Sequence, residues 1–271
     1  MTTYEMMIKT NHYLIKGSEL TDSQKENIVR QLLAAQSDER TKQSFYNGVK
    51  LPNNIDGDGR RMYPIFYIPP YNDGKKLQTV IPLTPKTHIL SANSYELEII
   101  RLLYLFAPDE PVVKDMVKKT LERLKTTCFG YQDCAIGECF HSALIVLRFL
   151  ATTAPEDIEW IKNLIKLFNK HMDEKLMLRG KGVHGNVLWY YWLCLSELPI
   201  EIAEPEIVKY KDRIIHQLSR SSVMNNENDK VNHPVMICML RNCLYRFPEY
   251  AHIKDTEPYV SEKDGRLHFD M

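Results

Sequence analysis

A recurring alternation between two kinds of helical segment constrains the fold more than any other feature of the sequence. Long apolar segments that suit buried helices alternate with segments whose polar residues fall on one helical face. The apolar segments begin at Tyr95, Cys139, Val187 and Val235, so the unit recurs every 44 to 48 residues. This spacing is typical of helical-hairpin repeats. It predicts a mainly all-α protein built from α/α hairpins.

The two kinds of segment also predict two layers. Apolar helices are expected inside and amphipathic helices outside, because only a helix with a polar face is stable against water. The predicted inner helices are 95–107, 139–152, 187–198 and 235–247, and the predicted outer helices, each opened by a proline, are 111–127, 155–175 and 205–220. We expect the inner helices at 139–152 and 187–198 to be neighbours. Such an array forms a superhelix or partial toroid, and HEAT-like arrays have an overlapping period.

The whole chain, 1–271, is predicted to form a single domain. Its parts are an N-terminal helical hairpin, an inserted β-hairpin, the α/α repeats and a C-terminal tail, at 1–36, 37–90, 91–250 and 251–271. Thr21 and Gln24 have the spacing of a capping box, which predicts a helix start at that point.

The insertion is rich in proline and glycine, so it cannot continue the helical pattern. Stretches with β-branched and aromatic residues at 62–68 and 77–83 flank an Asn-Asp-Gly turn at 72–74, which predicts a β-hairpin. An isolated hairpin is marginally stable. We therefore expect it to pack on the helical body as a cap, with at least one of Tyr63, Phe66 or Tyr67 buried.

The charge balance limits the partners that the chain would attract. Lys and Arg together number 35, as do Asp and Glu, and the pI is about 7.1. No overall field favours nucleic acid or an anionic membrane, so neither is an expected partner. The N-terminus does not resemble a secretion signal and three of the six cysteines lie in apolar segments, which predicts a cytoplasmic protein with reduced thiols.

Polar loops precede the predicted inner helices, and these loops meet on one rim if the hairpins stack in register. His88, His141, His184 and His233 each fall within about seven residues of an inner-helix start. The inner helices would also direct their free amide groups toward that rim, which favours an anion or a thiolate there.

The most reactive set of side chains on this rim is centred on Cys139. A cysteine near a helix N-terminus has a lowered pKa, and a histidine from a neighbouring loop would act as its base. The candidate catalytic residues are Asp133, Glu138, Cys139, His141 and His184. Cys134, Cys139 and His184 would equally suit zinc, although we predict no metal site and leave the cofactor open. The simplest alternatives are that Cys139 and His141 cap and pack a core helix, or that Cys139 takes part in regulatory redox chemistry.

A second group of side chains suits binding rather than chemistry. Aromatic rings near the rim or on the cap can stack on a flat ligand or anchor a partner. The candidate binding residues are Tyr67, Tyr131, Asn186, Trp189 and His233.

One short motif is similar to a known family. His184-Gly185 resembles the His-Gly pair that precedes inner helices in lanthionine-synthetase cyclases, whose toroid holds zinc on two cysteines and one histidine. The Cys-His-Gly motif of that family is absent here, and this chain is far shorter. The likeness covers a few residues, and the family is not assigned.

Two functions are consistent with these patterns. Stacked helical hairpins form extended surfaces, which favours a protein that binds a partner protein or peptide through its rim or concave face. The alternative is an α/α-toroid-type enzyme, such as a hydrolase, lyase or cyclase, with a Cys/His/acid site at the inner-helix N-termini.

Overall fold

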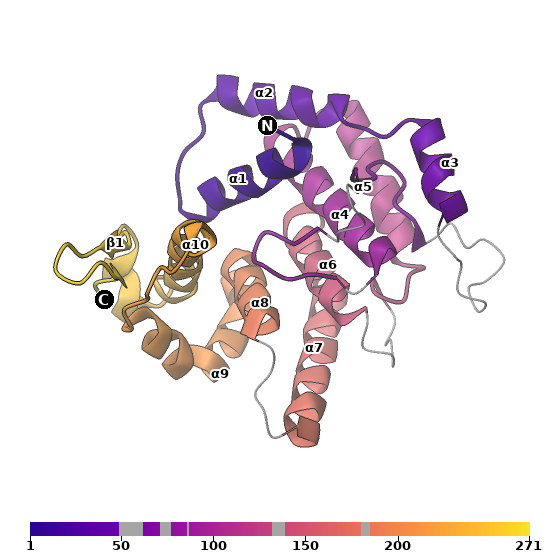
Figure 1. The fold of residues 1–271 in the computed structure, drawn as a ribbon. Helices are drawn as coiled ribbons and strands as arrows, with labels where there is room; N and C mark the ends of the chain where they lie inside the picture. The colour runs from indigo at the N-terminus through magenta and orange to yellow at the C-terminus, as the bar shows by residue number, and fades with distance from the viewer. Residues whose placement is uncertain (49–61, 71–76, 86, 132–138, 180–184) are drawn as a thin grey trace. The chain divides into compact units, whose positions relative to one another are not determined.

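The computed structural model describes residues 1–48, 62–70, 77–85, 87–131, 139–179 and 185–271 (Figure 1). For residues 173–179, 185 and 186 it describes the backbone alone. The described chain is mostly helical, which confirms the all-α fold class. The helices are α1 Thr3–Ile15, α2 Asp22–Ala34, α3 Glu39–Gly48, α4 His88–Phe106, α5 Pro111–Leu124, α6 Phe140–Thr153, α7 Ile158–Arg179, α8 Gly185–Glu197, α9 Ile200–Leu218, α10 Glu227–Leu244 and the 3-10 helix η2 Pro248–Ile253. The described strands are β1 Tyr259–Val260 and β2 Leu267–His268.

The chain divides into two compact units. Unit 1 contains Met1–Thr10 and Leu20–Val183, and unit 2 contains Asn11–Glu19 and His184–Met271. The predicted inner helices α6 and α8 therefore belong to different units, so their predicted neighbouring placement stays a prediction. The single domain also stays a prediction.

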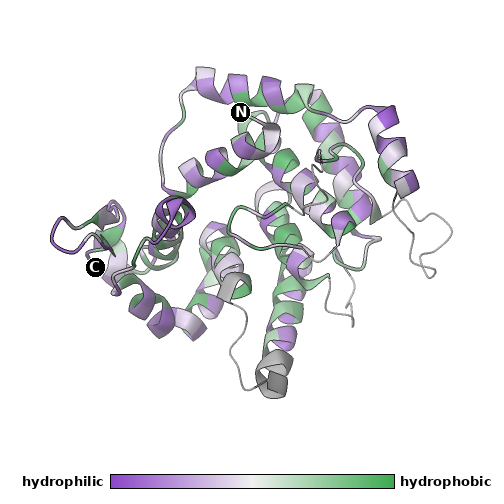
Figure 2. Cartoon of the chain, in the orientation of Figure 1, coloured by the Kyte–Doolittle hydropathy of each residue, from purple (hydrophilic) through white to green (hydrophobic). Residues whose placement is uncertain are grey.

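Unit 1 is organised around α4, whose residues Ile89 to Leu103 are all buried. This helix packs against α2, α5 and α6, and α7 packs against α6. The apolar character of α6 and the hydrophilic character of α3 are visible in Figure 2. In α5 one face is buried and the other is exposed. Within unit 1, the apolar helix α4 is therefore buried and the amphipathic helix α5 partly exposed, as their hydropathy predicts.

Unit 2 places α8 against α10, and α9 packs against both. The described side chains of α8 are mostly buried, whereas α9 is amphipathic. Strands β1 and β2 are antiparallel, with Tyr259 opposite His268, and Leu267 forms a further bridge to Ser222. The C-terminal tail is thus partly ordered as a small sheet.

Several predicted helix boundaries are wrong. Helix α4 begins at His88 after the N-cap Thr87, and α10 begins at Glu227 after the N-cap Asn226, so both begin about two turns before the predicted starts at 95 and 235. Pro111 lies in the first turn of α5 as predicted, but Pro205 lies inside α9 and α7 begins after Pro155. Helix α3 lies within the predicted insertion and was not expected.

The predicted β-hairpin is also wrong wherever the structure describes it. Residues 62–70, which we call the strap, and residues 77–85 contain no strand, and the predicted turn at 72–74 lies outside the described residues. Prolines in both segments remove backbone donors that a ladder needs. The amides of Ile65 and Phe66 instead donate to Glu96 Oε1 over 2.7 and 2.6 Å. Tyr63, Phe66 and Tyr67 are buried, which confirms the expected packing of this segment.

Two buried ion pairs lie between the helices of unit 1. Arg123 Nη1 of α5 donates to Glu96 Oε2 of α4 over 2.5 Å and to the carbonyl oxygen of Tyr63 over 2.7 Å. Arg148 Nη1 of α6 donates to both carboxylate oxygens of Glu98 over 2.9 and 2.8 Å. These charges are stable inside an apolar core because each has an oppositely charged partner.

Among the residues that the structure describes, no helix combines the length and apolar character needed to cross a membrane.

Candidate functional site

A tight turn at residues 125–131 follows α5 and positions the candidate site in unit 1. The amide of Thr127 donates to the carbonyl oxygen of Leu124, and the amides of Gly130 and Tyr131 both donate to the carbonyl oxygen of Thr127. A Cβ atom on Gly130 would lie 2.3 Å from the Leu124 carbonyl oxygen, which is closer than two such atoms can approach. The turn therefore requires glycine at this position, and its backbone is fixed by local bonds.

The turn directs one aromatic ring to solvent. Tyr131 is 48% exposed and contacts the ring of Trp160 edge to face, with 5.7 Å between centroids. Trp160 is held in turn by a hydrogen bond from its Nε1 to the carbonyl oxygen of Gly130 over 2.7 Å. The exposed Lys125 places its Nζ 5.5 Å from the centroid of the Trp160 ring. We call Tyr131, Trp160 and Lys125 the Tyr131 face.

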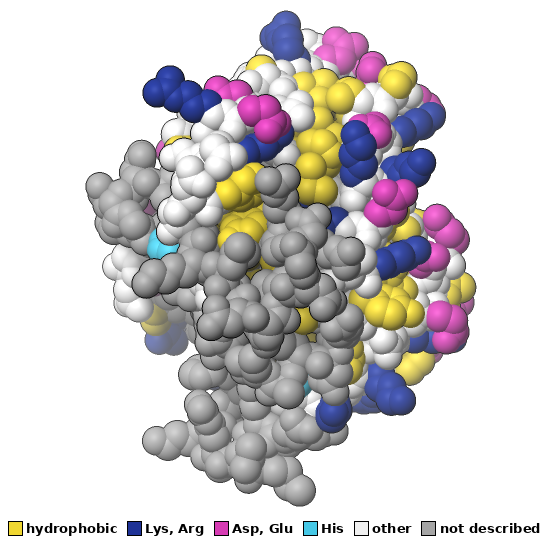
Figure 3. All heavy atoms as spheres, turned by 90° about the vertical axis from the view of Figure 1, so that its right-hand side faces the viewer, with side chains coloured by type: hydrophobic (Ala, Val, Ile, Leu, Met, Phe, Trp, Pro, Cys, Tyr) yellow, Lys and Arg dark blue, Asp and Glu magenta, His cyan; other side chains and the backbone are white. Residues whose placement is uncertain are grey.

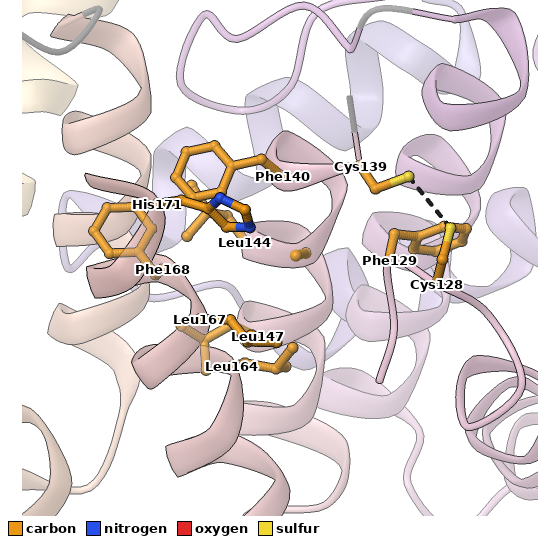
Figure 4. A pocket seen from close by; sticks show the side chains of 11 residues that line it. Cys128, Phe129, Cys139, Phe140, Leu144, Leu147, Leu164, Leu167, Phe168 and His171 are labelled. Carbon is orange, nitrogen blue, oxygen red and sulfur yellow. Dashed lines mark hydrogen bonds between the residues drawn. The ribbon is translucent and has the colours of Figure 1, made fainter. Parts of the chain in front are cut away.

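The same turn contributes to an apolar pocket between the turn, α6 and α7 (Figure 4). The pocket is small, with a cavity volume of about 20 Å³, and it is partly open to solvent. Its lining is Cys128, Phe129, Cys139, Phe140, Ala143, Leu144, Leu147, Leu164, Leu167, Phe168 and His171. We call it the thiol pocket, because two cysteines are among its few polar groups.

Two sulfur atoms meet in this pocket. Cys128 Sγ lies 3.3 Å from Cys139 Sγ. Cys139 is the N-cap of α6 and is 8% exposed, whereas Cys128 is half-buried. The positive end of the helix dipole favours the thiolate form of a cysteine at such a position.

The histidine of the pocket, His171, lies in α7 and was not among the predicted partners of Cys139. The ring of His171 packs against Phe140 with 5.4 Å between centroids, beside Phe168, and Figure 4 shows it apart from the two sulfurs. Cys139 contacts the thiol of Cys128. The expected acid–base arrangement of Cys139 with His184 falls outside the described residues and stays a prediction.

The other candidate catalytic residues are placed as follows. Asp133, Glu138 and His184 lie outside the described residues. His141 lies in the first turn of α6, where it is half-buried with its ring 6.1 Å from that of Phe140. Cys139 and His141 therefore share one helix start.

The candidate binding residues are distributed over both units. Tyr131 is exposed in unit 1, whereas Tyr67 is fully buried, with its hydroxyl 3.9 Å from Met116 Sδ. Burial raises the pKa of Tyr67, as expected for a phenol that packs in the core rather than facing a ligand. In unit 2, Trp189 is half-buried with its ring 5.2 Å from that of Trp192, and His233 Nε2 lies 3.8 Å from Asp229 Oδ1 within α10. The side chain of Asn186 lies outside the described residues.

Several residues of the site were missed in the sequence. Cys128 gave a signal in its spacing of eleven residues from Cys139, but nothing in a sequence shows that a turn will bring the two together. Lys125 and Trp160 gave no signal in the sequence.

Outside the site, Glu98 and Arg148 gave a clear signal, since a charged residue in a helix that is otherwise apolar requires a partner. Glu98 also borders a smaller pocket that includes Tyr4, Ser91 and Ser94.

Within the described parts of the chain, no three His, Cys, Asp or Glu side chains are grouped so as to hold a metal ion. No protein-family model, curated protein or solved structure matches this chain. The fold and the site thus define an all-α protein with an exposed aromatic anchor beside an apolar, thiol-lined pocket.

Proposed function

We propose that this protein binds a partner protein or peptide through the Tyr131 face and the thiol pocket. The observation that carries this proposal is the exposure of Tyr131 on a turn whose backbone is already fixed. A rigid exposed aromatic residue loses little conformational entropy on binding, and tyrosine and tryptophan dominate the energetics of protein interfaces. One turn supplies both surfaces, since Phe129 and Cys128 line the pocket two and three residues before Tyr131.

The chemistry of the two surfaces specifies the partner segment. The thiol pocket is small but lined mostly by carbon, so its mouth suits contact with an apolar side chain of the partner. Lys125 is exposed on the same turn, beside the ring of Trp160, and suits a carboxylate. The expected ligand is therefore a peptide with one apolar residue and a neighbouring acidic residue.

The wider architecture supports the same class of function. We propose that the α/α hairpins form a superhelix or partial toroid, supported by the alternation of buried and half-exposed helices within each unit. On the face drawn in Figure 3, lysine and arginine side chains are interspersed with aspartate and glutamate. Mixed charge of this kind suits a protein partner better than nucleic acid. A cytoplasmic location remains part of the proposal.

A displayed library of random peptides, selected against the purified full chain, tests the proposal. The expected binders contain an apolar residue next to an acidic residue. Their affinity is expected to fall by at least about 2 kcal/mol in Tyr131→Ala, because that change removes the anchor ring. The affinity is measured by calorimetry with the synthetic peptides.

Tyr13→Ala is the matched control, since Tyr13 is a comparably exposed tyrosine, at 42%, that lies in α1. Binders are expected to keep their affinity for this variant. Failure to select any peptide, or peptides that bind Tyr131→Ala as tightly as the natural chain, would reject the Tyr131 face as the binding site.

An enzyme with Cys139 as nucleophile is the second candidate function. The position of Cys139 at the N-terminus of α6, inside a pocket that also contains His171, favours it. Iodoacetamide labelling of the folded protein near neutral pH distinguishes the two functions. Rapid labelling of Cys139 that slows in His184→Ala supports catalysis, and a slow reaction that is unchanged by the substitution counts against it.

A further inference from the structure

We infer that Cys128 and Cys139 form a reversible disulfide by exchange with a small disulfide such as oxidised glutathione. This assigns a covalent modification site to unit 1, and it does not depend on the proposed partner binding. The site joins the turn after α5 to the first residue before α6.

The geometry requires only a small movement. The two sulfur atoms are 3.3 Å apart, and a disulfide bond is about 2.05 Å long. Closing this gap of about 1.3 Å lies within the range of rotation of the two side chains. The two sulfur atoms are already adjacent in the thiol pocket, as the dashed line in Figure 4 marks.

The two cysteines differ in a way that assigns their roles. Cys128 is the more exposed thiol, so its thiolate attacks one sulfur of the small disulfide, the S–S bond breaks, and one thiolate leaves and takes up a proton. Cys139, at the start of α6, then loses its proton to water, attacks Cys128 Sγ and releases the second small thiol. One disulfide is reduced to two thiols, and two protein thiols are oxidised to one disulfide. The second step is fast because the sulfurs are already adjacent.

The described cysteines of unit 2 are not expected to compete. Cys194, Cys238 and Cys243 are fully buried. Burial raises the pKa of Cys238 to about 11 and that of Cys243 to about 12, so few of these thiols are ionised near neutral pH. Cys134 lies outside the described residues, and the experiment therefore has to distinguish it.

The experiment equilibrates the folded full chain with oxidised glutathione near neutral pH and counts the free thiols that remain. The expected result is the loss of two thiols from the six in the chain, with no bound glutathione by mass. Digestion after acidic residues separates the cysteines of this region, because Asp133 lies between Cys128 and Cys134 and Glu138 precedes Cys139. The map is expected to show one bridge, between the peptides of Cys128 and Cys139.

Two variants provide the matched comparison. Cys134→Ser is expected to lose two thiols like the natural chain, whereas Cys128→Ser is expected to form no internal bridge and to retain its other thiols. Because the bridge is mapped in the natural protein, the result does not depend on how well a variant folds. A bridge that uses Cys134, or stable glutathione adducts without an internal bridge, would overturn the assignment.

Discussion

The pair of Glu96 and Arg123 shows how single residues fix the least regular part of unit 1. Glu96 Oε1 accepts the amides of Ile65 and Phe66, while Arg123 bonds both to Glu96 and to the carbonyl oxygen of Tyr63. Two charges thus satisfy three backbone groups of the strap. A proline-rich segment without strands keeps a fixed position by this means.

Replacement of Arg123 by methionine is expected to destabilise the protein by about 3–5 kcal/mol, because it leaves the carboxylate of Glu96 buried without its partner. Urea unfolding followed by circular dichroism measures the loss. The double variant Glu96→Gln/Arg123→Met is expected to be more stable than Arg123→Met alone, because no buried charge is left unpaired.

Lys119→Ala is the control on the same helix. Lys119 Nζ lies 2.7 Å from Asp115 Oδ2, but both side chains are about half exposed, so the loss is expected to stay below about 1 kcal/mol. Equal losses in Arg123→Met and Lys119→Ala would show that the buried pair does not hold the strap.

Individual site residues could be predicted from the sequence only in part. Tyr131 and Cys139 were identified, since an aromatic residue and a thiol beside a helix start are visible in the chain. The contact of Cys139 with Cys128 was not, because it depends on a turn fixed by the close approach of Gly130 to Leu124. Tyr67 was expected to be available to a ligand, and its burial depends on the tertiary position of the strap.

At the scale of elements, the apolar helices were predicted well and their beginnings poorly. Hydrophobic periodicity detects the buried part of a helix, so the first two turns of α10 were assigned to a loop. Those turns are polar and exposed, but Asn226 caps them through a bond from the amide of Asp229 to Asn226 Oδ1 over 3.0 Å. Local capping therefore extends a helix beyond its buried segment.

Asn226→Ala is expected to lower the stability of the protein by about 1 kcal/mol, because it removes the acceptor for the first turn of α10. Thermal unfolding measures the change. Asn225→Ala, at the preceding exposed position, is expected to stay within about 0.5 kcal/mol of the natural chain. If the two variants are equally stable, the cap does not maintain the polar end of the helix.

At the scale of the whole molecule, buried titratable groups predict how stability depends on pH. Burial raises the pKa of Cys238 from 9.0 to about 11, that of Cys243 from 9.0 to about 12, and that of Tyr95 from 10.0 to about 12. Above pH 9.0 the unfolded chain releases protons that the folded chain retains. Below pH 9.0 these groups are expected to leave the free energy of unfolding unchanged. As the pH rises from 9.0 toward 11, they are expected to lower it.

Urea unfolding at a series of pH values across this range measures the decline. Cys243→Ala is expected to show a shallower decline than the natural chain, by up to about 1.4 kcal/mol for each pH unit, because one of the three groups is gone. The cavity left by the substitution lowers stability equally at every pH, so the slopes remain comparable. Parallel curves for the two proteins would contradict this origin of the alkaline instability.

The overall fold class could be read from the chain because alternating apolar and amphipathic helices have few stable arrangements. The β-hairpin could not be rejected, since segments 62–68 and 77–83 have strand-like composition. Their amides donate instead to side chains of Glu96, Ser37 and Ser91, and these acceptors depend on the tertiary fold. The division into two units has no composition boundary to mark it, and α1 contributes residues to both.

The anchoring of the strap also has a consequence for the order of folding. The side chain of Arg123 bonds to Tyr63, 60 residues earlier in the chain, and that of Glu96 bonds to Ile65, 31 residues earlier. Ser37, which precedes the strap in the chain, accepts a hydrogen bond from the amide of Ile68. Contacts at such separations form only after the loop-closure entropy of the intervening chain has been overcome. Hydrogen bonds within α4 and α5 are local, so we expect these helices to form first and the strap to pack onto them late. Weakening its anchors would accelerate unfolding while the rate of refolding stays nearly constant.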